Sequence, residues 1–219
     1  MPRLLFEKTG RSVWISHLDL MRLFQRAFKR AGLKLKHTQG YNPRPSVSIA
    51  LPLSVGVESE CELLDFDLEG ESTSNEQICA LLNESLVDGV KVKAVYDGGK
   101  KIGALSLLSC RITLEYSNKL PGDAAHQIAA LFNRETLVLP KKTKSGIQEQ
   151  DIIPMIKGVS THLEDMHTIV VDTLICCQNP TLNPAQMILA VETYLPELRP
   201  DFSKCRRIEI YDINETVFR

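Results

Sequence analysis

The residues best suited to chemistry lie between positions 16 and 44, and most of them are cations or hydrogen-bond donors. The set is Ser16, His17, Arg22, Arg26, Lys29, Arg30, Lys34, Tyr41, Asn42 and Arg44. Arginine and lysine carry the charge that attracts polyanions, and arginine also matches the geometry of phosphate. Within this set only histidine has an unperturbed pKa near neutral pH. These residues therefore favour recognition of a phosphate-rich ligand such as RNA over catalysis.

A helix after Ser16 is expected to position most of these cations. Ser16 is a good N-cap, Asp19 is the acidic partner of a capping box, and Gly32 is a natural stop. At helical spacing one side is apolar. Its members are Leu20, Leu23, Phe24, Ala27, Phe28 and Ala31. The opposite side, called the basic ridge below, consists of Arg22, Arg26, Lys29 and Arg30.

The basic ridge has two readings that the sequence leaves open. Most helical charge is simply solvated. However, Asp19 is the one acidic residue within helical reach, and like charges four residues apart, such as Arg22 and Arg26, cost some stability. An unbalanced cationic face of this kind favours an anionic ligand.

The turn Gly40-Tyr41-Asn42-Pro43-Arg44-Pro45 follows the helix. Each proline disfavours a helical conformation of the residue before it, so Arg44 is presented from a stiff, extended backbone. Stiffness lowers the entropy lost on binding, which indicates a ligand contact. The alternative is a rigid connection in which Tyr41 packs on the core.

His17 would occupy the first helical position, where free N–H groups and Ser16 could hold a phosphate or carboxylate. It could also be the general acid–base of a metal-independent ribonuclease, with Arg44 or Lys36 stabilising the charged transition state. No partner base is evident in the sequence, so a catalytic His17 is the less favoured hypothesis.

The 219 residues carry a net charge of −1, but the charge is unevenly distributed. Residues 1–50 contain ten Lys or Arg, whereas residues 51–90 contain ten Asp or Glu and no Lys or Arg. Such asymmetry indicates a polyanionic partner for the basic part. The acidic segment 58–76 could equally lie beside the basic part and neutralise it.

Cofactor and metal motifs are missing from the sequence. The six cysteines form no C-x-x-C pair and lie mostly in apolar runs, which is typical of buried, reduced thiols. There is no zinc spacing, phosphate-binding glycine loop or nucleophile elbow. No signal peptide and no membrane-spanning run are evident, so we expect a cytoplasmic protein without a cofactor.

Hydrophobic periodicity predicts an α+β fold with two halves of similar element order. Strands are expected at 3–8, 46–50, 61–68 and 90–96, and a second helix after the possible caps at 72–75, ending at Gly89. After a boundary at 97–101, strands are expected at 104–116, 136–139 and 166–177, a basic turn at 140–146, an edge strand at 147–156 and a last strand at 206–213.

Two helices are expected in this second half, one after Asp123 and one after Asn183, with Gln186 as the box partner of the latter. The order β-α-β-β-α-β predicts two ferredoxin-like units in tandem, residues 1–97 and 102–219. A single larger α+β domain is the alternative.

Several strings together resemble the radical-SAM-linked domain, a bacterial family of unknown function. They are Ile-Ser-His-Leu-Asp-Leu-Met-Arg, Arg-Ala-Phe-Lys-Arg-Ala-Gly-Leu, Gly-Tyr-Asn-Pro-Arg-Pro and Pro-Leu-Ser-Val-Gly-Val-Glu-Ser. The resemblance is strong over residues 1–70. It implies partnership with a radical S-adenosylmethionine enzyme, to which such domains are fused or which they accompany as separate chains.

The chain lacks the C-x-x-x-C-x-x-C motif, so it is not expected to carry that enzyme's iron–sulfur cluster. The turn departs from the family pattern Pro-His-Pro, because Arg44 occupies the histidine position. Arginine there fits anion recognition better than proton transfer.

Three functions follow from the sequence. The favoured one is a non-catalytic recognition or adaptor protein that binds RNA, or another phosphate-rich ligand, for a radical S-adenosylmethionine partner. The second is a ribonuclease using His17, for which the architecture of CRISPR RNA-processing endonucleases offers only an analogy. The third is a protein-docking subunit whose acidic and basic segments are the contact patches.

Overall fold

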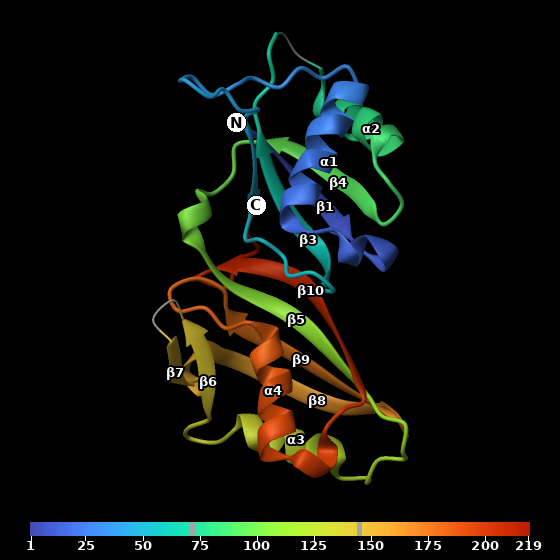
Figure 1. The fold of residues 1–219 in the computed structure, drawn as a ribbon, viewed down its shortest axis with the longest axis vertical. Coiled ribbons are helices and arrows are strands. Elements are labelled where there is room, and N and C mark those ends of the chain that lie inside the picture. Colours follow the sequence, from blue (N-terminus) through green and yellow to red (C-terminus); the bar gives the residue numbers. More distant parts are fainter. Residues whose placement is uncertain (71–72, 144–145) are drawn as a thin grey trace. The chain divides into compact units, whose positions relative to one another are not determined.

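The computed structural model describes residues 1–70, 73–143 and 146–219. Glu71 and Ser72, from the predicted acidic and capping segments, and Lys144 and Ser145, from the predicted basic turn, lie outside the described residues. The chain forms two compact units, Met1–Ala104 with Arg219, and Leu105–Phe218 (Figure 1). Whether residues 1–97 and 102–219 fold as independent domains stays a prediction.

The first unit is a four-stranded antiparallel sheet with two helices (Figure 1). Its elements are β1 (Pro2–Lys8), the 3-10 helix η1 (Gly10–Trp14), α1 (His17–Arg30), β2 (Val47–Ala50), β3 (Glu58–Phe66), α2 (Asn75–Ser85), β4 (Val90–Asp97) and η2 (Ile102–Ala104). The strands lie in the order β4-β1-β3-β2, and each neighbouring pair is antiparallel. The third strand, predicted at 61–68, is observed at Glu58–Phe66, and the second helix ends at Ser85 rather than at Gly89.

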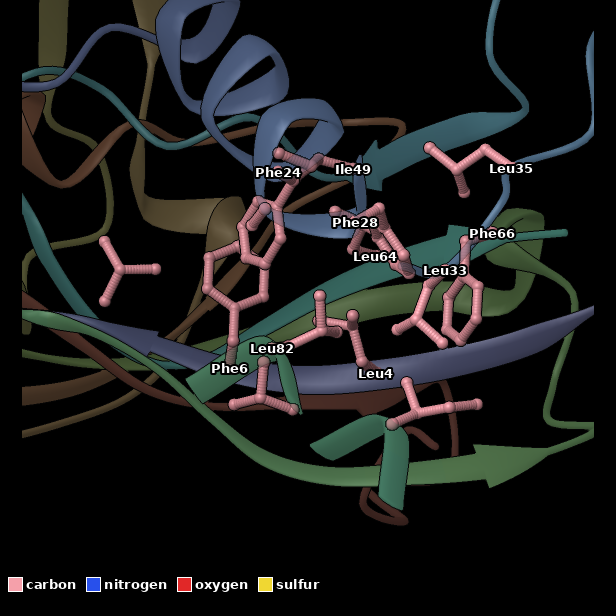
Figure 2. Close-up of a cluster of buried hydrophobic side chains, with 14 of the residues drawn as sticks. Leu4, Phe6, Phe24, Phe28, Leu33, Leu35, Ile49, Leu64, Phe66 and Leu82 are labelled. Carbon is pink, nitrogen blue, oxygen red and sulfur yellow. The ribbon is translucent and has the colours of Figure 1, made fainter. Parts of the chain in front are cut away.

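The core of the first unit lies between the sheet and the two helices (Figure 2). Phe24 meets Phe6 edge-on with ring centroids 4.7 Å apart, and Phe28 lies 5.0 Å from Phe66. Leu20, Phe24, Ala27 and Phe28 are buried, which confirms the predicted apolar side of α1. Because this side is fixed in the core, the basic ridge on the opposite side must face outward.

Both ends of α1 are defined by local interactions. The Ser16 hydroxyl oxygen accepts a hydrogen bond from the Asp19 N–H at 3.2 Å, which confirms Ser16 as the N-cap. Gly32, with φ of +72°, follows the helix in the left-handed conformation that glycine adopts readily. Just before the helix, the buried Lys8 ammonium donates to the carbonyls of Val13 and Ile15, at 3.1 and 2.8 Å.

The second unit has a four-stranded antiparallel sheet and a separate hairpin. Its elements are β5 (Leu105–Glu115), α3 (Ala124–Phe132), β6 (Val138–Thr143), β7 (Gly146–Asp151), η3 (Ile153–Met155), β8 (Ile156–Asp165), β9 (Thr168–Cys176), α4 (Pro184–Tyr194), η4 (Pro196–Leu198) and β10 (Phe202–Asp212). The sheet order is β10-β5-β9-β8, and β6 pairs with β7 (Figure 1).

The second unit corrects three predictions. Residues 140–143 belong to β6 rather than to a turn, and they pair with residues 146–149 of β7. Strand β8 was not predicted at all. Asn183 caps α4 as expected by accepting from the Ala185 N–H, but the Gln186 Oε1 atom is buried without a hydrogen-bond partner in the described chain, so the predicted capping box is not formed.

The predicted α+β class is confirmed, with mostly antiparallel strands and four α-helices in residues 1–70, 73–143 and 146–219. The prediction of buried thiols is also confirmed. All six cysteines are thiols outside any disulfide, and each is buried except Cys79, which is half-buried. Among the described helices none has the length and apolar character needed to cross a membrane.

Candidate functional site

The basic ridge divides into residues with a partner and residues without one. Arg22 Nη1 lies 2.9 Å from Asp19 Oδ1, an exposed ion pair within one turn of α1. Arg26 and Lys29 are exposed, and their side chains form no hydrogen bond or ion pair with any described residue. Exposed ion pairs contribute little stability, so Arg22 is also available to a stronger anionic partner.

Arg30 has a structural role that the sequence did not reveal. Its Nη2 atom donates to the carbonyl oxygen of Ser85 at 2.5 Å. Ser85 is the last residue of α2, where the final carbonyls of a helix lack intrahelical partners. A cation there satisfies one of them and complements the negative end of the helix dipole. Arg30 therefore joins the end of α1 to the end of α2.

The turn after α1 is a closed loop with an exposed tip. The Arg44 N–H donates to Thr38 Oγ1 at 3.0 Å, and the Thr38 N–H donates to the Arg44 carbonyl at 2.8 Å. Asn42 and Arg44 are exposed, and Tyr41 is fully exposed. The alternative in which Tyr41 packs on the core is therefore wrong. The tyrosine ring and the Arg44 guanidinium are both open to solvent.

Among the described residues, the acidic segment forms ion pairs with basic residues, but not with the exposed cations of the basic ridge and the turn. Asp65 binds the Arg3 guanidinium through both carboxylate oxygens, at 2.5 and 3.0 Å. Asp67 lies 3.2 Å from Lys36 Nζ. Arg26, Lys29 and Arg44 have no such partner in the part of the chain that the structure describes. The two charge blocks therefore meet at β1 and at Lys36, and the outer side of α1 remains positive.

Lys34 marks the edge of this positive surface. It is exposed and lies beside a groove of about 500 Å³ whose lining includes Asp67, Glu69 and Asp97. Carboxylates in a groove repel an anion, so the groove is a poor place for phosphate. The phosphate-facing side of the site is therefore α1 and the turn, not this groove.

The N-terminal end of α1 is already occupied by its own carboxylate. The Ser16 hydroxyl donates to Asp19 Oδ2 at 2.8 Å. This hydrogen bond, followed by that of Arg22, lowers the pKa of Asp19, which stays ionised. A negative side chain at the positive end of a helix competes with any external anion. Ser16 is thus a structural cap, and His17, the first residue of α1, is half-buried.

The structure does not bring His17 together with Lys36 or Arg44. His17 is two residues after Ile15, whose carbonyl accepts a hydrogen bond from Lys8. Lys8 in turn pairs with Ser59 at the start of β3, so His17 lies near this end of the strand. Lys36 donates from its backbone to Asp67, just beyond the other end of β3. A strand rises about 3.3 Å per residue, so these ends are about 25 Å apart. The catalytic arrangement considered for His17 has no support in this geometry.

The described residues offer no group of three or more His, Cys, Asp or Glu side chains that could hold a metal ion. The arrangement instead provides cations on a rigid helix and one cation on a closed turn. Thr38 is the residue that sequence reasoning missed. Its only signal is a hydroxyl side chain six positions before Arg44, a spacing that suits closure of a short loop.

Comparison with known proteins gives a family and a fold. Residues 2–184 match the family described as "Uncharacterized protein conserved in bacteria (DUF2344)". No curated protein matches the sequence.

Among solved structures, a chain from "Crystal Structure of a Cbf5-Nop10-Gar1 Complex" is similar over 95% of this chain, with a TM-score of 0.55 and 7% identity. This chain spans 48% of that one, about half its length. An unknown protein from Galdieria sulphuraria matches with a TM-score of 0.27 and 8% identity, over 94% of this chain and 96% of that one. At such identities the first likeness concerns the fold alone.

Proposed function

The chain belongs to the DUF2344 family of proteins conserved in bacteria, and we propose that it is a non-catalytic recognition or adaptor protein that binds RNA. Its binding surface is the outer side of α1, with Arg22, Arg26 and Lys29, together with Lys34 and the turn that carries Tyr41, Asn42 and Arg44. Other phosphate-rich ligands share the same chemistry, and RNA is the one to test first.

One observation carries this proposal. Arg26, Lys29 and Arg44 are exposed, and none has an ion pair or hydrogen bond from its side chain to any described residue, although the chain has abundant carboxylates. The net charge is only −1, so long-range attraction of the whole protein cannot draw in a polyanion. Binding must depend on this local surface, and it should weaken steeply with salt.

The proposal excludes a cleavage step for two reasons. His17 lies near one end of β3 and Lys36 near the other, and these strand ends are about 25 Å apart, so Lys36 is not placed to stabilise a transition state at His17. Arg44, in the position where the resembled family has histidine, cannot act as a base because arginine stays protonated in proteins. Binding without chemistry is the role that these residues support.

The partner in this proposal is a radical S-adenosylmethionine enzyme. Its support is the resemblance of residues 1–70 to domains that are fused to, or accompany, such enzymes. The chain would present RNA, and the enzyme would supply the iron–sulfur cluster and the reaction. Association of the two purified proteins, measured by calorimetry with and without RNA, tests this part separately.

The proposal also interprets both units as ferredoxin-like. In the first unit the elements β1, α1, β2, β3, α2 and β4 occur with the spatial order β4-β1-β3-β2. In the second unit the corresponding order is β10-β5-β9-β8, with the β6–β7 hairpin placed between α3 and β8. Both orders agree with a split β-α-β arrangement.

The test is RNA binding by fluorescence anisotropy over a salt series. The variant Arg26→Glu/Lys29→Glu reverses two cations of the proposed surface. The matched control, Lys91→Glu/Lys119→Glu, makes the same change in net charge at two exposed lysines elsewhere. We expect the first variant to lower affinity about tenfold or more and to reduce the salt slope by about 1.4, since each single-strand contact contributes about 0.7.

The control should leave the salt slope unchanged. Equal loss in both variants would show that binding follows net charge rather than this surface. No binding by the wild-type protein at low salt would overturn the RNA proposal and move the interpretation to a protein-docking subunit, whose association with its enzyme would then be the salt-sensitive step.

A further inference from the structure

The 3-10 helix before α1 carries the sole tryptophan of the sequence, Trp14, and this side chain is 71% exposed. Tryptophan offers more apolar surface than any other side chain, and it is highly buried on average. In this chain the phenylalanines of the first unit fill the core while Trp14 is left outside it. An exposed indole of this size is a surface that a ligand can cover.

The indole is exposed but not loose. A Cβ atom placed on Gly56 would lie 3.5 Å from Trp14 Cζ3, so the ring rests against the position where any other residue would have a side chain. Gly56 has φ of +84°, and its N–H donates to the Val13 carbonyl at 3.0 Å. The glycine therefore supports the indole from one side and leaves the rest of the ring open.

The backbone under Trp14 is held by long-range hydrogen bonds. Lys8 Nζ binds the carbonyls of Val13 and Ile15, and the Ser12 hydroxyl donates to the Asp88 carbonyl at 2.6 Å. Both Lys8 and Ser12 are buried. Anchoring of this kind reduces the entropy that a binding residue loses when its ligand arrives.

The cationic side chain of Arg11 belongs to the same 3-10 helix as the Trp14 indole. Arg11 and Trp14 are three residues apart in the same 3-10 helix, a spacing at which side chains eclipse and therefore project on one side. Arg11 is exposed, and its side chain forms no hydrogen bond or ion pair within the described ranges 1–70, 73–143 and 146–219. An aromatic face with an adjacent free guanidinium matches the two parts of a nucleotide, its base and its phosphate.

We propose that Arg11 and Trp14 form a platform for one unpaired nucleotide of a single-stranded RNA, with the base stacked on the indole and the phosphate bound by the guanidinium. This inference rests on the proposed function and specifies its substrate class. Bases in a duplex are stacked on each other, so only an unpaired base can lie on a protein ring. The strand would continue along α1 past Arg22, Arg26 and Lys29.

Protein docking is the competing use of the same surface. Leu18 and Val55 are exposed apolar residues of the same part of the unit, and apolar contacts of this kind suit a protein partner. The side chains of Arg11, Arg26 and Lys29 have no ion pair to any described residue, and this favours nucleic acid. A protein partner would need its own carboxylates opposite these three cations, whereas RNA carries a phosphate on every nucleotide. The experiment below separates the two.

The test uses the intrinsic fluorescence of Trp14, which needs no label because no other tryptophan exists in the chain. The full chain is titrated with a single-stranded oligouridylate of about 10 nucleotides and with an RNA duplex of equal length, while anisotropy reports binding in parallel. We expect the single strand to quench Trp14 emission and the duplex to leave it largely unchanged.

Variants extend the test to affinity. Trp14→Ala should weaken single-strand binding about tenfold, whereas Trp14→Phe, which keeps a stacking face, should recover most of it. Arg11→Gln should reduce the salt slope by about 0.7 without changing the preference for single strands. Circular dichroism of each variant establishes that η1 and α1 remain folded.

The outcomes distinguish this inference from the proposed function. RNA binding by anisotropy with unchanged Trp14 emission, and equal affinity for Trp14→Ala, would overturn the platform and leave the basic surface standing. Absence of RNA binding in the wild-type protein would overturn both. A Trp14 emission change on adding a radical S-adenosylmethionine protein, with none on adding RNA, would assign the surface to protein docking and overturn the platform.

Discussion

The backbone of Arg44 is bound twice by a single residue, Thr38. The Arg44 N–H donates to Thr38 Oγ1 at 3.0 Å, and the Arg44 carbonyl accepts from the Thr38 N–H at 2.8 Å. This pair closes a five-residue loop from Gln39 to Pro43, with Tyr41 at its exposed tip. The cation is therefore presented from a backbone that is fixed before any ligand is bound.

The first prediction concerns this closure. Thr38→Val keeps the shape and charge of the loop but removes the Oγ1 acceptor, so the Arg44 N–H loses its partner. We expect RNA affinity to fall about threefold to fivefold, because about 1 kcal/mol of ordering is transferred to the binding step. The measurement is anisotropy with the RNA used for wild type.

Thr38→Ser is the control for Thr38→Val, since it retains a hydroxyl and should bind as wild type does. Arg44→Ala, which removes the charge itself, should lose more affinity and also reduce the salt slope. Equal affinity in Thr38→Val and wild type would show that the hydrogen bond does not prepare the loop for binding.

The second prediction separates Arg30 from the rest of the basic ridge. Arg30→Gln loses the charged hydrogen bond to the Ser85 carbonyl, whereas Arg26→Gln loses no side-chain hydrogen bond or ion pair to any described residue. We expect Arg30→Gln to lower the free energy of unfolding by about 1 kcal/mol, in line with helix-end cations. Urea denaturation of both variants measures this, and a loss shared equally by Arg26→Gln would contradict it.

The third prediction concerns alkaline pH and Tyr116 of the second unit. Burial, with a smaller effect of Asp201, raises the pKa of Tyr116 from 10.0 to about 12, and its hydroxyl donates to the Leu198 carbonyl at 2.9 Å. Between these values the unfolded chain releases the proton and the folded chain keeps it. The stability that Tyr116 contributes is therefore complete below pH 10 and lost as pH rises through 12.

Urea denaturation from pH 9 to about 11.5 tests this prediction, with Tyr116→Phe as the variant that cannot titrate. The wild-type protein should lose stability faster with pH than Tyr116→Phe does. Parallel pH dependences for the two proteins would mean that Tyr116 is not responsible.

The fourth prediction is that His17 performs no chemistry. Purified protein should leave RNA intact, because Lys36 lies near the opposite end of β3 from the start of α1 and no base has been identified beside His17. His17→Ala should bind RNA within about twofold of wild type, because the proposed binding surface consists of other residues. Gel analysis of labelled RNA over several hours is the measurement. Cleavage that disappears in His17→Ala would overturn the proposal that the protein is non-catalytic.

The elements that could be predicted from sequence are those with strong local signals. Helix α1 has a cap at Ser16, a stop at Gly32 and a regular apolar side, so its bounds were nearly correct. Strand β8 was missed, although Val159, Thr161 and Leu163 alternate with more exposed residues. Strand β8 lies at the edge of the sheet, where its inward residues are only half-buried. Such positions accept polar residues, so the sequence does not alternate clearly between apolar and polar residues.

In the candidate site, too, local features could be predicted from sequence and long-range contacts could not. The exposed cations of α1 and the stiff turn follow from residue types and spacing. The Arg30 contact with Ser85 joins residues 55 positions apart, and the Lys36 pair with Asp67 also depends on tertiary packing. No local pattern encodes such pairs. Which cations are free could therefore be decided only from the structure.

The placement of the thiols gives each unit its own reporter of opening. Cys61 and Cys79 belong to the first unit, and Cys110, Cys176, Cys177 and Cys205 belong to the second. A buried thiol reacts with an alkylating reagent only when its surroundings open, so pulsed alkylation read by mass spectrometry would time the two units separately. The same experiment with RNA present would show whether a ligand on α1 slows alkylation only at Cys61 and Cys79 or at the thiols of both units. Slower alkylation in both units would mean that the two halves of the chain share one cooperative transition.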